Sequence, residues 1–183
     1  LSRVKEELNF VARWLPDDGT SHESPTYMIF GASHLLLGMT AGDRCLGTEN
    51  LQRPFFKNVN RFMTQTLTPG LTNRFIYGDA GGVGLGPIGY DVFEFKTIGV
   101  HDLEDHLAVM NTLHDRNGIG VARAWLGLVW YPKTLEAGSV ANIPERDFFA
   151  DLGLQFVRSD WDAGSAGAMV KCGPMGGYVL NKY

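Results

Sequence analysis

Cysteine, basic charge and long apolar runs are all scarce in this sequence. Its 183 residues include 2 cysteines, Cys45 and Cys172, which lie too far apart to form a metal-binding or redox motif, so we expect both to be buried thiols. Lysine and arginine total 16 against 20 acidic residues, for a net charge of −4, and they form no basic stripe. The composition therefore argues against a nucleic-acid partner. A local cationic cleft for an acidic substrate remains compatible with it.

The chain also lacks the segments that direct proteins to membranes. No stretch approaches the roughly 18–20 apolar residues of a transmembrane helix, so we expect no membrane partner. No signal peptide is visible, but the chain begins at Leu1 inside a helical pattern and without an initiator methionine. We interpret it as a segment of a longer protein, whose remaining segments would be its partners. The missing signal peptide therefore leaves both export and retention in the cytoplasm open.

Apolar residues in the first part of the chain recur at the spacing of helices. Helices are expected over the ranges 4–15, 25–41, 49–63, 103–113 and 121–130. The second begins with Ser24 as a cap and Pro25 as an early residue, and Gly42 and Asp43 end it. It is apolar on nearly every face, so it should be buried between neighbouring elements.

After residue 135 the pattern of the sequence changes. A short helix is expected in "PERDFFADL", residues 144–152, followed by three β-rich runs, "LQFVRSDW", "GAMVKCG" and "GYVLNKY". Helices first and antiparallel strands second indicate an α+β fold. We therefore divide the chain into a helical region, residues 1–135, and the start of a sheet region, residues 136–183.

A glycine-rich loop from Gly78 to Gly89 contains "GLGPIG", which matches the G-x-G-x-x-G pattern of dinucleotide-binding sites. Such a site needs a strand before the glycines and a helix that begins among them. Here Pro87 replaces a free amide, and the following "YDVFEF" resembles a strand. We favour a loop that borders a ligand site and keep a nucleotide-dependent oxidoreductase as the weakest alternative.

Two other groups of polar residues are interpreted as structural. His101, His106 and His114 share a predicted helix, but their spacings of five and eight do not match the three or four of a helical zinc pair. The carboxylates of "DWD", residues 160–162, are suited to a hard cation. A turn between two strands is the simpler interpretation of that tripeptide.

The stretch "DDGTSHESPTY", residues 17–27, carries three side chains that can handle protons: His22, Glu23 and Tyr27. They lie where a helix begins, and the free N–H groups of a helix N-terminus favour anions. Ordinary helix-start chemistry, with Ser24 as the cap, explains the same residues. The residues by themselves leave both interpretations open.

Two segments of the chain resemble heparinase II/III-like polysaccharide lyases. "DDGTSHESPTY" with the apolar helix after it resembles the "DG…E(G/S)P.Y" segment of that family. "FVRSDWDAGSAGAMVKCGPMGGY", residues 156–178, resembles the family's segment at the start of its β-domain. The two segments follow the order of the family, so the resemblance spans essentially the whole chain. Within the family it is strongest to exo-type oligoalginate lyases, although heparin, chondroitin and ulvan lyases share the scaffold.

The resemblance implies a fold, a reaction and a substrate class. The fold would be part of an incomplete α/α toroid followed by the first strands of an antiparallel β-sheet domain. The reaction would be β-elimination at a uronic acid of an acidic oligo- or polysaccharide, which needs no cofactor, although many members hold a structural zinc. The zinc ligands and the catalytic histidines would lie outside residues 1–183. A carbohydrate-binding relative without turnover is the alternative function.

The same resemblance assigns site residues by motif. Tyr27 would be the catalytic tyrosine, and His22 and Glu23 would bind substrate beside it. Tyr77 and Asp79, in "RFIYGDAGG", would contribute another wall of the cleft. A phenol with an ordinary pKa near 10 needs a perturbing environment to act as a base at neutral pH.

Overall fold

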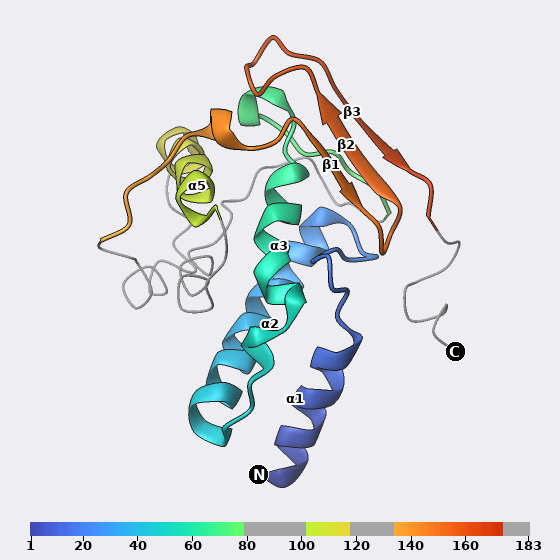
Figure 1. Cartoon of the computed structure of the whole chain (residues 1–183), viewed down its shortest axis with the longest axis vertical. Helices are drawn as coiled ribbons and strands as arrows, with labels where there is room; N and C mark the ends of the chain where they lie inside the picture. Colours follow the sequence, from blue (N-terminus) through green and yellow to red (C-terminus); the bar gives the residue numbers. More distant parts are fainter. Residues whose placement is uncertain (79–101, 118–133, 174–183) are drawn as a thin grey trace.

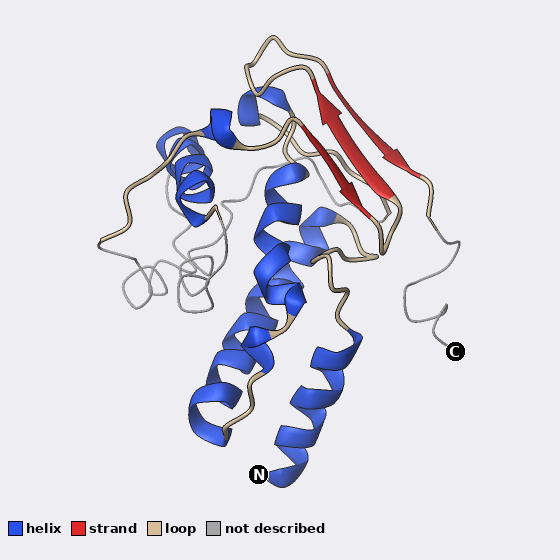
Figure 2. Cartoon of the chain, viewed as in Figure 1, coloured by secondary structure: helices blue, strands red, loops and turns tan. Residues whose placement is uncertain are grey.

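The computed structural model describes residues 1–78, 102–117 and 134–173 (Figure 1). In these segments helices come first and a three-stranded antiparallel sheet follows, which confirms the mixed α+β class. Figure 2 shows the sheet at one end of the helices. The helix expected over 121–130, the strand expected in "GYVLNKY" and the glycine-rich loop after Gly78 lie outside the described residues.

The described helices are α1 Ser2–Trp14, α2 Pro25–Leu46, α3 Pro54–Gln65 and α5 Leu103–Asn117. Short 3-10 helices are η1 Asn50–Gln52, η2 Pro69–Leu71 and η5 Val140–Asn142. The strands are β1 Arg146–Phe149, β2 Leu154–Arg158 and β3 Gly167–Lys171. None of the helices in the described segments is long and apolar enough to cross a membrane.

The predicted end of α2 at Gly42 and Asp43 is wrong. The helix continues for another turn and stops at Gly47, whose φ of 61° lies in the left-handed region that glycine tolerates best. Asp43 instead organises the turn that follows, because its carboxylate accepts hydrogen bonds from the amides of Asn50 and Leu51, both at 2.9 Å.

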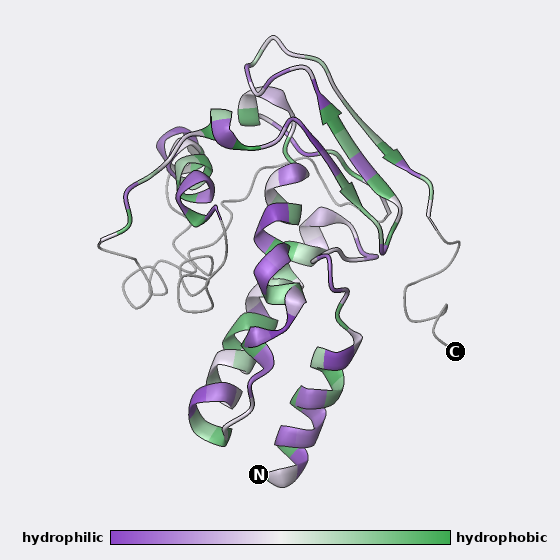
Figure 3. Cartoon of the chain, in the orientation of Figure 1, coloured by the Kyte–Doolittle hydropathy of each residue, from purple (hydrophilic) through white to green (hydrophobic). Residues whose placement is uncertain are grey.

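Burial of α2 is also less complete than its sequence predicts. Met28 and Leu36 face the core with 5% and 1% exposure, but Tyr27 is 48% exposed and Phe30 is 62% exposed. Figure 3 shows the hydrophobic residues along this helix. Described elements cover one side of α2 only, so burial of its other side by further polypeptide stays a prediction.

The short helix predicted over 144–152 is wrong as well, because β1 occupies its centre. Phe149 is fully buried, and its ring meets those of Phe62 and Phe156 edge-on at centroid distances of 5.1 and 5.9 Å. Phe148, on the opposite face of the strand, is 57% exposed. Phe149 packs in the core while its neighbour Phe148 faces solvent, as in a strand. The packing of Phe149 outweighs a weak local preference of this segment for helix.

The sheet has the order β1-β2-β3, and both pairings are antiparallel. Leu154 of β2 lies opposite Lys171 of β3. The connection between these strands contains residues 160–162, which confirms the turn interpretation of "DWD". Trp161 in that turn is buried, and its indole N–H donates to the Ile143 carbonyl at 2.8 Å.

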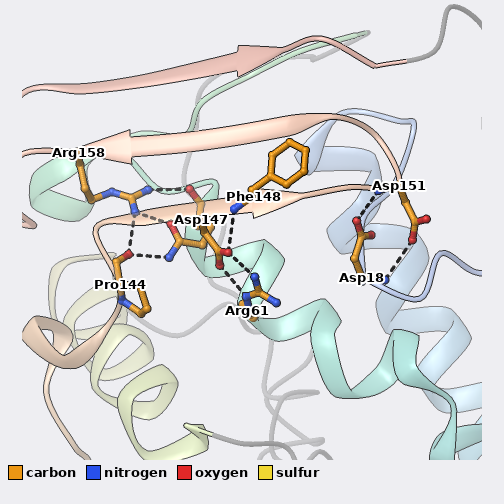
Figure 4. A network of polar contacts seen from close by, with 8 residues as sticks. Asp18, Arg61, Pro144, Asp147, Phe148, Asp151 and Arg158 are labelled. Carbon is orange, nitrogen blue, oxygen red and sulfur yellow. Dashed lines mark hydrogen bonds and ion pairs between the residues drawn. The ribbon is translucent and has the colours of Figure 1, made fainter.

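Two buried arginines donate hydrogen bonds around the end of α3, and one of them, Arg158, links this end to the sheet. Arg158 of β2 donates to the carbonyl oxygens of Gln65 and Leu67 at 2.8 and 3.2 Å, and its side chain lies between the strand and the helix end in Figure 4. Arg74 donates to the Met63 carbonyl at 3.0 Å. Carbonyls at a helix C-terminus have no partner within the helix, so these arginines supply partners for them. The Met63 carbonyl also accepts from the Thr66 hydroxyl at 2.6 Å.

Both cysteines are exposed, so the prediction of buried thiols is wrong. Cys45 lies on the outer side of the last turn of α2. Cys172 follows β3, an outer strand of the described sheet in which most residues are exposed. Cys45 contacts solvent because it lies at a helix end, and Cys172 contacts solvent because it follows an outer strand.

Candidate functional site

The loop between α1 and α2, together with the first turns of α2, borders a cavity of about 330 Å³. We call it the α1–α2 pocket. Its walls are formed by Trp14, Leu15, Pro16, Thr20, Ser21, His22, Glu23, Tyr27, Met28, Gly31, Ala32, Leu35 and Phe55. The apolar side chains come mainly from the helices, and the polar ones come from the loop and the start of α2.

The loop is held against α3 by close backbone contact. Gly19 has a φ of 81°, and a Cβ built there would lie 2.4 Å from the Val59 amide nitrogen, so only glycine fits. The Asn58 side chain donates to the Asp17 carbonyl at 2.8 Å. Within the loop, the Asp18 carboxylate accepts from the hydroxyl and amide of Thr20 at 2.6 and 3.1 Å. The loop therefore has a defined conformation rather than a free one.

A reciprocal pair of aspartates joins this loop to the sheet. The Asp151 amide donates to the Asp18 carboxylate at 2.8 Å, and the Asp18 amide donates to the Asp151 carboxylate at 3.2 Å. Figure 4 shows the two residues facing each other between the loop and the turn from β1 to β2. The loop that borders the pocket is therefore fixed to the sheet region, although no residue of the described strands lines the pocket itself.

Tyr27 lies on the first turn of α2, at the rim of the pocket that His22 and Glu23 also line. The Ser24 hydroxyl caps this turn by accepting from the Tyr27 amide at 3.5 Å. Because the side chain of Tyr27 is 48% exposed, its phenol is not sealed in the core. The structure therefore brings together three of the five residues that sequence motifs single out.

Tyr77 lies behind the loop. Its hydroxyl donates to the Ser21 carbonyl at 2.6 Å. Burial raises the pKa of the Tyr77 phenol well above its usual range, and the negative charge of Asp18 raises it further, so the group stays protonated. Tyr77 thus supports the segment that carries His22, whereas Asp79 lies outside the described residues.

The environment of His22 favours its neutral form. Burial lowers the pKa of the imidazole, and the positive charge of Lys171 lowers it further. A neutral imidazole can accept a proton from a ligand, whereas an imidazolium cannot. His22 is therefore suited to proton transfer or to hydrogen bonding at the pocket rim over a wider range of pH.

The chemistry of the pocket is divided between an apolar floor and a polar rim. Trp14, Met28, Leu35 and Phe55 line the floor, where the ring of a ligand can pack. Trp14 and Phe55 were not singled out from the sequence, because an aromatic residue on an apolar helix face looks the same whether it faces a core or a pocket. In the described segments, no group of three or more histidine, cysteine, aspartate or glutamate side chains is placed to hold a metal ion.

A second, smaller cavity of about 160 Å³ lies between α3, the start of α5 and η5. His106 contributes to it, and its Nδ1 atom lies 2.6 Å from the Thr64 hydroxyl. The Arg61–Asp147 ion pair forms another side (Figure 4). Most polar groups around this cavity are engaged with one another, so we regard it as structural.

Comparison with models of known protein families gives no match, and comparison with curated proteins gives none. The assignment to a lyase family therefore stays a prediction from the two motifs. Arg158 and Trp161 of the second motif have structural contacts here, and His22, Glu23 and Tyr27 of the first motif lie around the pocket.

Proposed function

We propose that this chain carries one wall of the active site of a polysaccharide lyase that cleaves uronic-acid-containing glycans, with alginate oligosaccharides as the leading substrate. The described helices would then be part of an incomplete α/α toroid, and the sheet would begin the β-domain. One observation carries the proposal. Tyr27, His22 and Glu23, which the first motif singles out, line one cavity beside the loop that is hydrogen-bonded to the sheet region.

The arrangement fits the proton transfers of β-elimination. The reaction removes the proton on C5 of the uronate and protonates the departing glycosidic oxygen on C4. A phenol and a neutral imidazole on one rim can exchange protons with a ring that packs on the apolar floor. In the proposed reaction a base outside this chain takes the C5 proton, and Tyr27 donates its phenolic proton to the departing oxygen on C4. His22 and Glu23 hold the sugar beside it.

The first test is Tyr27→Phe in the complete protein, with formation of the unsaturated uronate followed by its ultraviolet absorbance. The substitution removes one oxygen atom from a half-exposed side chain, so packing should change little. Turnover should fall by roughly 10²-fold or more if the phenol transfers protons. Tyr27→Phe with near-normal turnover would end the assignment of this residue even if the lyase activity itself is found.

Carbohydrate binding without turnover is the second candidate, and the largely apolar floor of the pocket favours it. Both functions predict that acidic oligosaccharides bind. Only the lyase predicts an absorbing product when alginate, heparin, chondroitin and ulvan fragments are incubated with the protein. Binding of any of them with no product over long incubation would select the binding protein.

A further inference from the structure

A separate groove lies between α1 and the connection from α2 to α3. Its volume is about 750 Å³, and it shares no lining residue with the α1–α2 pocket. One wall comes from α1 and the other from residues 47–54, which include η1. We call it the α1–η1 groove. Figure 1 shows α1 at the end of the helices away from the sheet.

The α1–η1 groove is rich in charged side chains. Its three cations and two carboxylates are Lys5, Arg13, Arg53, Glu6 and Glu49. The lining therefore has a net positive charge, although the whole chain has a net charge of −4. Along α1, a rise of about 1.5 Å per residue separates Glu6 from Arg13 by roughly 10 Å. Within the described part of the chain, no ion pair joins Arg13 or Arg53 to a carboxylate.

A contact between two asparagines anchors both arginines. The side-chain amide of Asn50, a residue that is 2% exposed, donates to the side-chain oxygen of Asn9 at 2.9 Å. Arg53 donates from its Nε atom to the side-chain oxygen of Asn50 at 3.3 Å. Arg13 donates from its Nε atom to the Asn9 carbonyl, also at 3.3 Å. The two guanidinium groups are thus attached to one contact between α1 and η1.

The outer nitrogens of these guanidinium groups are available to a ligand. Among the described residues, none accepts a hydrogen bond from Nη1 or Nη2 of Arg13 or Arg53. Lys5 differs, because its Nζ atom donates to the carbonyls of Leu46 and Gly47 at 3.1 and 3.2 Å, at the C-terminal end of α2. The arginines are therefore the cations of the groove whose outer N–H groups the described fold leaves unused.

We propose that the α1–η1 groove binds a tetrahedral oxyanion, a phosphate or sulfate group, which Arg13 and Arg53 hold between them. A guanidinium group presents its N–H donors in a planar fork that matches the oxygens of such an anion. A tetrahedral anion has enough oxygens to accept from two forks at once. Arg53 also directly precedes α3, and the dipole at the N-terminus of that helix favours an anion.

The proposed site is independent of the proposed lyase function, because it uses another cavity and another chemical group. A groove of about 750 Å³ exceeds the size of an inorganic ion. It therefore has room for the free ion and for an ester that carries the same group. A purely structural explanation is that the asparagines join α1 to η1 and that the arginines are only solvated. That explanation predicts no preference of either arginine for phosphate over chloride.

The first experiment is an NMR titration of the wild-type chain with inorganic phosphate, with a parallel titration with sodium chloride at the same ionic strength. The Nε–H signals of Arg13 and Arg53 should shift and saturate with phosphate and change little with chloride. Arg3, on the same helix but outside the groove, is the internal control. Equal responses to the two salts, or responses no larger than that of Arg3, would overturn the proposal. This titration decides the question even if a variant fails to fold.

The second experiment measures phosphate binding to variants by calorimetry. Arg13→Gln and Arg53→Gln should each weaken binding by about 10-fold, as expected for loss of hydrogen bonds from a charged group. Arg13→Lys should also weaken binding, because it keeps the charge but loses the fork. Arg3→Gln removes the same charge from the same helix and should keep the wild-type affinity. Equal weakening in Arg3→Gln and Arg13→Gln would indicate a general effect of charge and would overturn the proposal.

Two further probes identify the source of the anion. Inorganic sulfate and glucose 6-phosphate are titrated into the wild-type chain in the same way. Stronger binding of glucose 6-phosphate than of inorganic phosphate would identify an ester as the ligand, and weaker binding would identify the free ion. Failure of phosphate, sulfate and glucose 6-phosphate to bind would overturn the proposed site. The lyase proposal would be unaffected by that result, since it is tested by the absorbance of the unsaturated uronate.

Discussion

His22 in the loop before α2 and His106 in α5 both have a pKa lowered by burial, but their surroundings differ. His106 is 6% exposed, and its Nδ1 atom lies 2.6 Å from the Thr64 hydroxyl. Burial lowers its pKa to about 4 against a smaller opposing effect of Asp105. His22 is less buried, and a lysine on another element contributes to its shift.

The comparison shows why a perturbed pKa does not by itself identify a functional site. The larger shift belongs to His106, whose cavity of about 160 Å³ is surrounded by polar groups already paired with one another. The smaller shift belongs to His22, which shares a cavity of about 330 Å³ with a carboxylate and a half-exposed phenol. Space for a ligand and other groups able to exchange protons distinguish the second region.

The largest expected effect that tests the difference between His106 and His22 is a loss of stability at acid pH caused by His106. The folded pKa of His106 is about 4, below the 6.5 of an unperturbed imidazole. Above pH 6.5 both folded and unfolded forms are neutral. Between roughly pH 6.5 and 4 only the unfolded chain gains the proton, so stability falls as pH falls, by on the order of 3 kcal/mol in total.

His106→Gln should remove this contribution, because glutamine does not titrate. Unfolding in denaturant, measured at several values of pH from 7 to 4, should give a flatter dependence for the variant than for the wild type. His34→Gln on the exposed face of α2 is the control and should keep the wild-type dependence. Parallel curves for wild type and His106→Gln would contradict a neutral, buried His106.

The intermediate effect concerns the link between the pocket loop and the sheet. Asp18→Ala removes the acceptor for the Thr20 hydroxyl and for the Asp151 amide, at 2.6 and 2.8 Å. Loss of these hydrogen bonds to a charged group should lower the free energy of unfolding by about 2 kcal/mol, as thermal or chemical unfolding would show. The exposed Asp17→Ala is the control, because only its backbone carbonyl is used. Equal stability of the two variants would show that the loop is not held by Asp18.

The sequence predicted those parts of the fold that depend on local pattern. The start of α2 follows from Ser24 and Pro25, and the order of helices before strands follows from the spacing of apolar residues. The segment 144–152 could not be assigned in this way, because the burial of Phe149 depends on Phe62 of α3, which is distant in sequence, and on pairing of its strand with β2.

In the candidate site, too, local sequence predicted some residues, and contacts between distant segments could not be predicted. His22, Glu23 and Tyr27 are close in sequence, so one short motif was enough to single them out together. Asp151 is distant from this motif in sequence, and only the fold brings its amide to the Asp18 carboxylate in the pocket loop. Contacts of that kind leave no signal in the spacing of residues along one chain.

The smallest effect compares the two tyrosines of the pocket region. Tyr77→Phe removes the hydroxyl that donates to the Ser21 carbonyl at 2.6 Å, and it leaves that carbonyl without its partner. We expect a loss of about 1 kcal/mol in the free energy of unfolding, seen as a lower melting temperature. Any loss of turnover should be secondary, because the Tyr77 phenol is held protonated by burial and the charge of Asp18. Tyr27→Phe should show the reverse pattern, with stability kept and turnover lost, since its side chain is half exposed at the rim. If Tyr77→Phe and Tyr27→Phe lose stability and turnover in the same proportions, the two phenols do not have separate structural and catalytic roles.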